Sequence, residues 1–139
     1  MILVVIFCLP ALASASWSDS FSQDSFSDPL VNEKKYIVAS VENEEAPGEA
    51  DAVAEAMIGA LRNSGAELVM GDAALGSISE LKDDAIIEKA TQRNVDYVSV
   101  IRVYPGGQSG KATAVINTYN PKGKLTWTVS VNRGQKVKA

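Results

Sequence analysis

Histidine is absent from this sequence of 139 residues. Histidine is the usual proton shuttle at neutral pH, the usual base beside a serine or cysteine nucleophile, and a frequent zinc ligand. Its absence excludes a Ser-His or Cys-His catalytic pair. We therefore expect that the protein is not an enzyme and that it has no catalytic residue, no metal site and no cofactor.

Cysteine is almost as scarce, because Cys8 is the only one and lies in the apolar stretch at the start of the chain. A lipoprotein signal places a small residue directly before its cysteine, whereas the bulky Phe7 stands there. A chain without its first 15 residues would contain no cysteine. We expect it to fold without disulfides and to carry no thiol chemistry.

Long hydrophobic runs are missing too. Residues 2–12 are apolar but include Pro10 and are too few to span a bilayer, which takes about 20 residues. They precede Ala13-Ser14-Ala15, which fits the small-x-small cleavage pattern of a secretory signal peptide. No basic residue precedes the run, a departure that an upstream start codon would explain. We predict a signal peptide over 1–15, cleavage near Ala15, and a periplasmic or secreted protein; the alternative is a short hydrophobic strand of a cytosolic protein.

Residues 16–32 contain few aliphatic side chains and many Ser and Asp. Such a composition buries too little apolar area to offset chain entropy, so we predict a flexible tether. Its aromatic residues Trp17, Phe21 and Phe26 allow two interpretations. They are plain linker residues, or they form a linear motif whose rings dock on a partner.

Residues 33–133 predict a single domain with the order β-α-β-α-β-β-β. We expect an α+β fold (an α/β two-layer arrangement) with a mixed sheet of about five strands and both helices packed on one face. A basic tail, 134–139, follows and looks frayed. The expected strands cover 34–42, 66–71, 95–104, 111–119 and 124–132. The expected helices lie within 42–65, with Pro47 in the first turn and Gly65 as the C-cap, and within 81–93, which a capping pair, Ser77 and Glu80, precedes.

The last two strands have the clearest pattern. Asn-Pro-Lys-Gly between them is a good turn sequence, because Pro fixes φ and Gly accepts a positive φ. In strand 124–132 the apolar residues Leu125, Trp127, Val129 and Val131 alternate with polar ones, which predicts one buried and one wet face. Strand 95–104 is apolar on both faces and is expected in the centre of the sheet.

The stretch YPGGQSGKAT, residues 104–113, superficially resembles a nucleotide-binding loop. Aligned on Gly110-Lys111, it has Pro105 in place of the first glycine and Ala112 in place of the metal-binding hydroxyl. A strand follows instead of a helix, so no helix N-terminus would face the phosphates. We interpret the stretch as a flexible hairpin loop.

Acidic residues are missing from the last third of the chain, since all 17 lie at or before Asp96. The net charge of −4 argues against a nucleic-acid partner, but the uneven distribution is typical of an interaction surface. The alternative is that the two halves complement each other within the fold, with lysines that guard sheet ends. The candidate basic residues for binding an envelope protein or another anionic envelope component are Arg102, Lys111, Lys122, Lys124, Arg133 and Lys136.

Two motifs resemble a known group of proteins. NVDYVSVIRV is similar to a strand entry, and NTYNPKGKLTWTVSV to a Trp-containing hairpin, in the small α/β domain of bacterial envelope accessory proteins, the group that includes the TolB N-terminal domain, CsgG and LpoB. The resemblance covers about residues 34–133, and its motifs are structural. It implies protein–protein interaction in the periplasm and no catalytic residues.

These observations favour a non-catalytic periplasmic or secreted interaction module, an accessory of an envelope or secretion complex. Two other hypotheses stay open. One is a small carboxylate-dependent hydrolase, and the other is a calcium- or ligand-binding module built on the acidic stretch 42–51. The sequence does not identify the partner or the oligomeric state.

Overall fold

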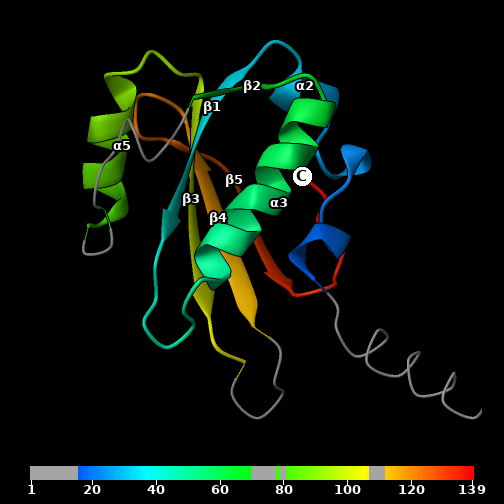
Figure 1. The fold of residues 1–139 in the computed structure, drawn as a ribbon. Helices are drawn as coiled ribbons and strands as arrows, with labels where there is room; N and C mark the ends of the chain where they lie inside the picture. Colours follow the sequence, from blue (N-terminus) through cyan, green and yellow to red (C-terminus); the bar gives the residue numbers. More distant parts are fainter. Residues whose placement is uncertain (1–15, 70–77, 79–80, 107–111) are drawn as a thin grey trace, which may run out of the picture.

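The fold is built on a five-stranded mixed sheet with the strand order β2-β1-β3-β4-β5 (Figure 1). The computed structural model describes residues 16–69, 78, 81–106 and 112–139. The mixed sheet and the α+β class are as the sequence predicts. The strands are β1 (Lys35–Val41), β2 (Glu67–Val69), β3 (Tyr97–Tyr104), β4 (Thr113–Tyr119) and β5 (Leu125–Asn132), and the helices are η1 (Trp17–Asp19), η2 (Gln23–Ser25), α2 (Asp28–Val31), α3 (Glu49–Asn63) and α5 (Asp83–Thr91).

Strand β3 occupies the centre of the sheet, parallel to β1 and antiparallel to β4. Its apolar residues are buried on both faces, as its unbroken apolar pattern predicts: Val98 and Val100 lie in one core cluster, Ile101 and Val103 in the other. The central position thus follows from the sequence. The sheet separates two core clusters, which have no side chain in common among the described residues.

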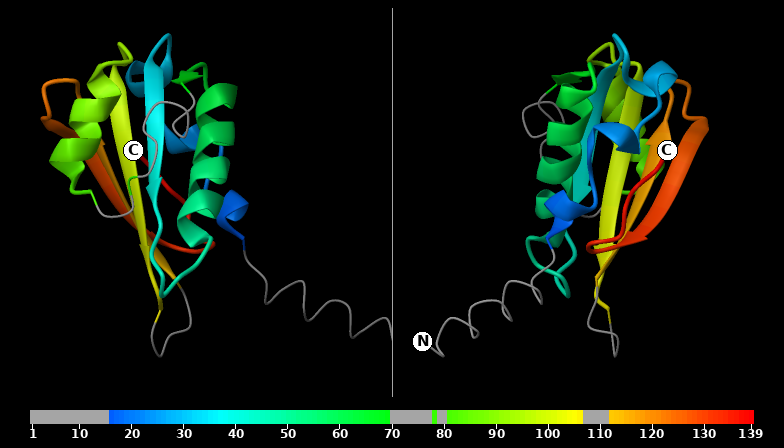
Figure 2. Two further views of the ribbon diagram at one scale, coloured as in Figure 1. Left: turned by 60° about the vertical axis from the view of Figure 1, so that its left-hand side comes forward. Right: turned by 90° about the vertical axis from the view of Figure 1, so that its right-hand side faces the viewer.

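Helices α3 and α5 lie on opposite faces of this sheet (Figures 1 and 2). The prediction that both pack on one face is wrong. The connection from β1 through α3 runs outward to β2, and the connection through α5 runs back across the sheet to β3. Crossovers between parallel strands are almost always right-handed, so two crossovers in opposite directions place their helices on opposite faces.

Residues 16–32, the N-terminal segment, belong to the folded body, so the prediction of a flexible tether is also wrong. Trp17, Phe21, Phe26 and Val31 are buried in the core cluster that contains α3. Phe26 lies 5.8 Å from the ring of Trp127 on β5. These few aromatic residues bury enough apolar area to order a segment whose composition is otherwise rich in Ser and Asp.

Residues 134–139, the C-terminal tail, hold the N-terminal segment in place (Figure 2). The Val137 amide donates to the Ser20 carbonyl at 2.9 Å, and the Ala139 amide donates to the Ser25 carbonyl at 2.7 Å. The Ser27 amide donates to the Ala139 carbonyl at 3.1 Å. Val137 is buried, so the predicted frayed tail is instead an ordered part of the core. The two ends of the described chain therefore form one closed layer beside α3.

The β4–β5 hairpin turns where predicted. Gly123 adopts φ +85°, and the side chain of Asn120 accepts hydrogen bonds from the amides of Lys122 and Lys124 at 3.0 Å. Beyond the turn, a register shift pairs Tyr119 with Leu125 and leaves Leu125 47% exposed. The predicted alternation therefore begins at Trp127 and not at Leu125.

Several sequence predictions lie outside the described residues. They are the signal peptide over 1–15, the capping pair Ser77 and Glu80, and the glycine-rich centre of the loop at 107–111. The second helix begins at Asp83, two residues later than expected, after Lys82 as its N-cap residue.

Candidate interaction surface

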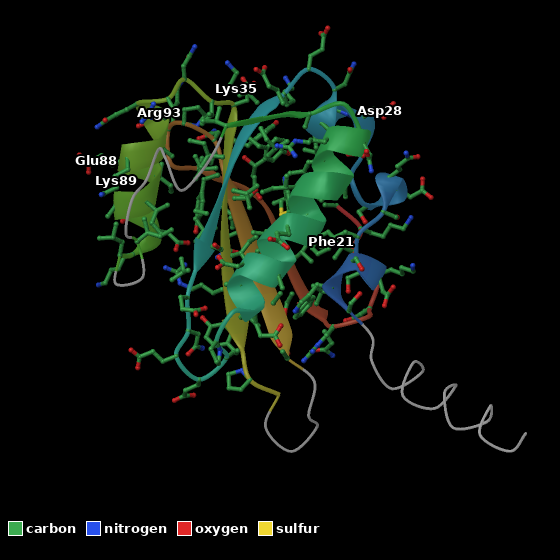
Figure 3. The ribbon with its side chains drawn as sticks, in the orientation of Figure 1. Phe21, Asp28, Lys35, Glu88, Lys89 and Arg93 are labelled. Atoms are coloured by element: carbon green, nitrogen blue, oxygen red, sulfur yellow. The ribbon has the colours of Figure 1, made fainter. Side chains whose placement is uncertain are left out.

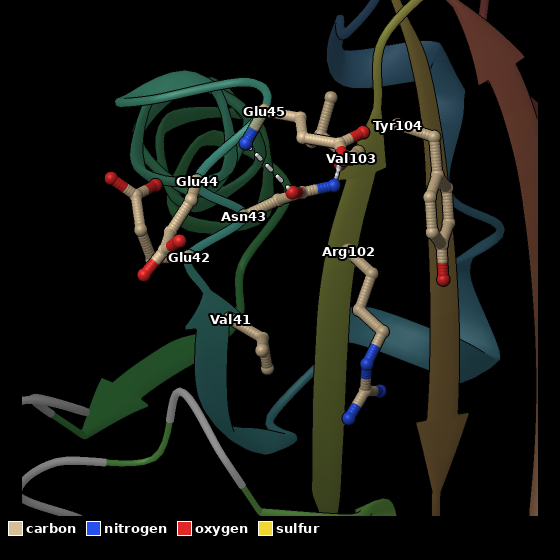
Figure 4. Close-up of a pocket in the computed structure, with 8 residues that line it drawn as sticks. All are labelled: Val41, Glu42, Asn43, Glu44, Glu45, Arg102, Val103 and Tyr104. Atoms are coloured by element: carbon tan, nitrogen blue, oxygen red, sulfur yellow. Dashed lines mark hydrogen bonds between the residues drawn. The ribbon is translucent and has the colours of Figure 1, made fainter.

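One hollow of about 540 Å³ lies at the carboxyl ends of β1 and β3, where ligands often bind in open α/β sheets (Figure 4). It is wide open. The carboxylates of Glu42 and Glu44 lie on the opposite side of it from the guanidinium of Arg102. Glu42 instead accepts a hydrogen bond from the Gly48 amide at 3.1 Å, ahead of α3. Glu42 thus stabilises a loop, and the carboxylates here do not converge on the hollow from both sides as a pair of catalytic carboxylates would.

Arg102, predicted to meet a partner, lies at the centre of an internal cluster. It forms an ion pair with Asp83 and donates to the Leu81 carbonyl at 3.1 Å. The hydroxyl of Tyr119 donates to the other oxygen of Asp83. Burial raises the pKa of Tyr119 to about 12, and the hydrogen bond to the Asp83 carboxylate adds to this shift. The cluster ties the start of α5 to β3 and β4.

Arg133, directly after β5, forms a second internal cluster beside the start of α3. Its guanidinium lies 3.4 Å from Glu49 and 5.9 Å from the ring centre of Trp17. The indole N–H of Trp17 donates to the same carboxylate at 2.7 Å. Arg133 and Trp17 therefore join the N-terminal segment and β5 to the first turn of α3. Arg102 and Arg133 thus agree with the alternative interpretation, in which basic residues of the last third of the chain pair with acidic residues of the earlier part within the fold.

The other two aromatic candidates are also engaged inside the fold. Phe21 and Phe26 stack on each other with ring centres 6.4 Å apart, and both are buried; Phe21 lies beside α3 (Figure 3). In this structure they do not form a docking motif for a partner.

The remaining basic candidates are dispersed. Lys122 and Lys124 are exposed at the β4–β5 turn, and Lys136 is exposed beyond the other end of β5. Lys122 shares a shallow hollow with Asp84 and Glu88 of α5. Lys111 lies outside the described residues. Lys122, Lys124 and Lys136 thus do not form one basic patch, because they lie at the two ends of β5.

What the structure does expose is the outer half of the sheet on the α5 side. Helix α5 covers β1 and β3, and its core cluster reaches only Tyr119 on β4. Beyond it, Asn117 accepts from Thr128 at 2.6 Å and Asn132 accepts from Thr113 at 2.8 Å, across the β4–β5 ladder. We call this surface the open face. The described side chains that form it are Tyr104, Thr113, Val115, Asn117, Thr128, Ser130 and Asn132.

The polar alternation in β5 was visible in the sequence, and the predicted wet side of that strand is confirmed by the exposed Thr128, Ser130 and Asn132. The contribution of β4 was not predicted. Thr113, Val115 and Asn117 are half-buried and join the open face because they pair with β5. Alternate polar residues in strand 111–119 were the available signal.

Among the described residues, no three acidic side chains come together as ligands for a metal ion. Over the same parts of the chain, no helix combines the length and apolar character needed to cross a membrane.

Comparisons with known proteins extend the fold assignment. No protein-family model matches the chain, and neither does any curated protein sequence. Among solved structures, the chain is similar to the LpoB C-terminal domain from Escherichia coli, with a TM-score of 0.61 and 15% identity, over 84% of this chain and 96% of that one. The same domain from Salmonella enterica gives 0.61 and 16%, over 86% and 98%.

A third similar structure is the lipoprotein GNA1162 from Neisseria meningitidis, with a TM-score of 0.55 and 18% identity, over 71% of this chain and 78% of that one. The resemblance to LpoB is therefore confirmed at the level of the fold: the chain is a small α/β domain of the kind found in such envelope proteins. At these identities the likeness concerns architecture alone.

Proposed function

We propose that this protein is a non-catalytic interaction module of the bacterial cell envelope, periplasmic or secreted, which serves as an accessory of an envelope or secretion complex and binds a protein partner there. The fold likeness to LpoB and GNA1162 supports the envelope setting. The absence of histidine from the sequence supports a role without acid–base or nucleophilic chemistry.

The observation that carries the proposal is the uncovered outer half of the sheet. Its polar face, with Thr128 and Asn117 hydrogen-bonded across the ladder, is presented to solvent by the two strands β4 and β5. No Asp or Glu occurs in β4, β5 or the tail. A partner with a complementary polar and acidic surface would meet no like charge there.

The location rests on residues 1–15 acting as a leader. Cleavage after Ala15 would leave Ser16 as the first residue, and its nitrogen lies 3.0 Å from the Asp19 carboxylate. A new terminal ammonium would form a charge-assisted hydrogen bond there. Trp17, one residue on, is already buried. The body would thus begin directly at the cleavage point, with no spacer.

The location is tested by expressing the full chain with a C-terminal tag and fractionating the cells. We expect the tagged protein in the periplasm or the medium, with the mass of residues 16–139. An uncleaved protein retained in the cytoplasm would contradict the proposed location.

The binding role is tested by affinity capture from envelope extracts of the native host, with partners identified by mass spectrometry. We expect a discrete co-purifying protein that is lost in the double variant Val115→Glu, Asn117→Glu on the open face. The matched control is Glu55→Lys, on the exposed side of α3. Unchanged capture by the double variant, or loss in the control as well, would reject the open face as the binding surface.

A further inference from the structure

The outer edge of β5 offers unpaired backbone groups to another strand. In an antiparallel ladder, hydrogen-bonded and non-hydrogen-bonded pairs alternate. The Arg133 amide donates to the Ala112 carbonyl at 3.2 Å, which makes that pair hydrogen-bonded. Counting back in register, Val131, Val129 and Trp127 bond to β4. The amides and carbonyls of Thr128, Ser130 and Asn132 consequently point away from the sheet.

One end of this edge is closed by the chain itself. The Asn132 amide donates to the Gln135 side chain at 3.1 Å, and the Asn132 carbonyl accepts from the Gln135 amide at 2.9 Å. Nothing in the described part of the chain pairs in this way with the outward backbone of Thr128 or Ser130. Beyond Gln135, the tail pairs with the N-terminal segment through Val137 and Ala139. The open edge is thus the stretch around Thr128 and Ser130.

This edge also lacks the usual protection. Soluble proteins block exposed edge strands with a charge, a proline or a short length. Strand β5 has eight residues, Leu125–Asn132, without a charged residue or a proline. Its charges stand outside it, at Lys124 before the strand and Arg133 after it. An edge of this kind is available for strand addition.

We propose that β5 binds an extended segment of a partner protein as a sixth strand, through the backbone of Thr128 and Ser130. This inference rests on the proposed function and specifies its mode of binding. On the α3 side the added strand would lie beside the half-buried side chains of Trp127 and Val129, so apolar residues are favoured there. On the open face it would continue the polar row of Thr128 and Ser130, so Thr or Ser is favoured.

The charges at the two ends of β5 favour a partner protein over a second copy of this chain as the source of the added strand. A two-fold pairing of β5 with itself, with Thr128 opposite Ser130, would bring the turn with Lys124 of each copy to the Arg133–Lys136 end of the other. Like charges would then meet at both ends, which disfavours the pairing. An extended segment with acidic residues at its ends would instead meet lysine at both ends of the strand. The occupant we infer is such an acid-flanked segment.

The test uses the protein of residues 16–139 and the synthetic peptide Asp-Asp-Val-Thr-Val-Thr-Val-Asp-Asp as the probe. We expect NMR amide exchange at Thr128 and Ser130 to slow by at least about tenfold when the peptide is added, because one new hydrogen bond protects each amide. The same peptide with Lys in place of Asp should bind on the order of tenfold more weakly at low salt. This difference should shrink at high salt.

Two variants of Thr128 distinguish the contribution of its backbone amide to peptide binding from that of its side chain. Thr128→Pro removes an outward-pointing amide and leaves the ladder with β4 intact, so the fold should persist while peptide binding is lost. Thr128→Ala keeps the amide and should bind like the wild type. Should Thr128→Pro unfold, an N-methylated peptide, which cannot pair along its backbone, serves in its place and should not bind.

Strand addition at β5 can fail in these experiments while the proposed interaction role holds. Equal peptide binding by wild type and Thr128→Pro, or protection of amides elsewhere, would overturn strand addition. If Thr128→Pro also leaves the envelope partner bound while Val115→Glu, Asn117→Glu releases it, the interaction module stands and its binding mode is different. A dimer in sedimentation experiments that Thr128→Pro dissociates would identify a second copy as the occupant and contradict the acid-flanked partner.

Discussion

The two faces of the sheet differ in how completely they are covered. The α3 face is closed by α3, the N-terminal segment and the C-terminal tail, which bring both ends of the described chain into one core. On the opposite face, α5 covers β1 and β3, and within the described residues no element covers the outer half of the sheet. One sheet thus carries a sealed side and a half-open side.

The two sides of the sheet thus have different roles: one stabilises the fold and the other presents a surface. Apolar burial on the α3 side supplies the stability that a protein without disulfides needs. The hairpin β4–β5 can then display polar residues and an unpaired edge at little cost to the fold. The charged clusters at Arg102 and Arg133 anchor α5 and the N-terminal segment, one on each side.

The largest effect should come from the sealed side. Phe26→Ala should lower the free energy of unfolding by about 3–5 kcal/mol, because the removed ring is buried against Trp127 and leaves a cavity. Urea denaturation monitored by Trp fluorescence measures the loss. Phe26→Leu, which retains apolar volume, should lose much less. A value for Phe26→Ala near zero would mean that the N-terminal segment is a tether after all.

A buried hydroxyl pair gives the next largest effect. Ser99 and Thr118 lie 2.6 Å apart, oxygen to oxygen, in the core on the α3 side. Ser99→Ala should cost about 1–3 kcal/mol, because the Thr118 hydroxyl is left buried without its partner. The double variant Ser99→Ala, Thr118→Val should recover most of this loss in the same denaturation assay. Additive losses would show that the two hydroxyls act independently.

On the half-open side, Asp83→Asn should lower the pKa of Tyr119. The carboxylate raises the pKa of Tyr119 in addition to burial, so the variant should lower that pKa from about 12 toward the usual value near 10. Tyrosinate absorbance, taken as the difference from a Tyr119→Phe variant, measures it. An unchanged pKa would mean that Asp83 does not contact Tyr119.

The same group makes stability depend on pH. Because Tyr119 holds its proton more tightly when folded than when unfolded, its contribution is fully present below pH 10 and is lost as the pH rises toward about 12. Tyr119→Phe should therefore flatten the decline of stability between these values. An identical decline in both proteins would assign it to other groups.

The smallest effect on stability is expected for Tyr104, the exposed aromatic residue of the open face. Tyr104→Ala removes a side chain that is 47% exposed, so the free energy of unfolding should change by no more than about 0.5 kcal/mol. Thermal unfolding provides the measurement. A loss as large as that of Phe26→Ala would erase the difference between the two sides.

Local patterns predicted the elements of the fold well. The apolar strand around Val98 and Val100, the helical spacing of Val53 and Met57, and the turn at Gly123 each depend on neighbours within a few residues. The placement of the helices failed for another reason. It follows from the order of strands in the sheet, which no local pattern records.

The N-terminal segment shows the same limit. Trp17 and Phe26 sit in a stretch whose composition resembles a linker, and their partners Glu49, Arg133 and Trp127 lie far away in the sequence. The basic candidates differ for the same reason: Lys124 is exposed, whereas Arg102 forms an ion pair with Asp83 of α5, which the local sequence pattern does not indicate. The wet side of β5 was predictable, because alternation is a local signal.

The central claim is that the half-open side meets the partner. Its most direct test is photo-crosslinking in living cells, with a photoreactive amino acid placed at Ser130 on β5 or at Glu55 on α3. We predict an adduct of defined mass at Ser130 and none at Glu55. An adduct at Glu55 with none at Ser130 would contradict the claim.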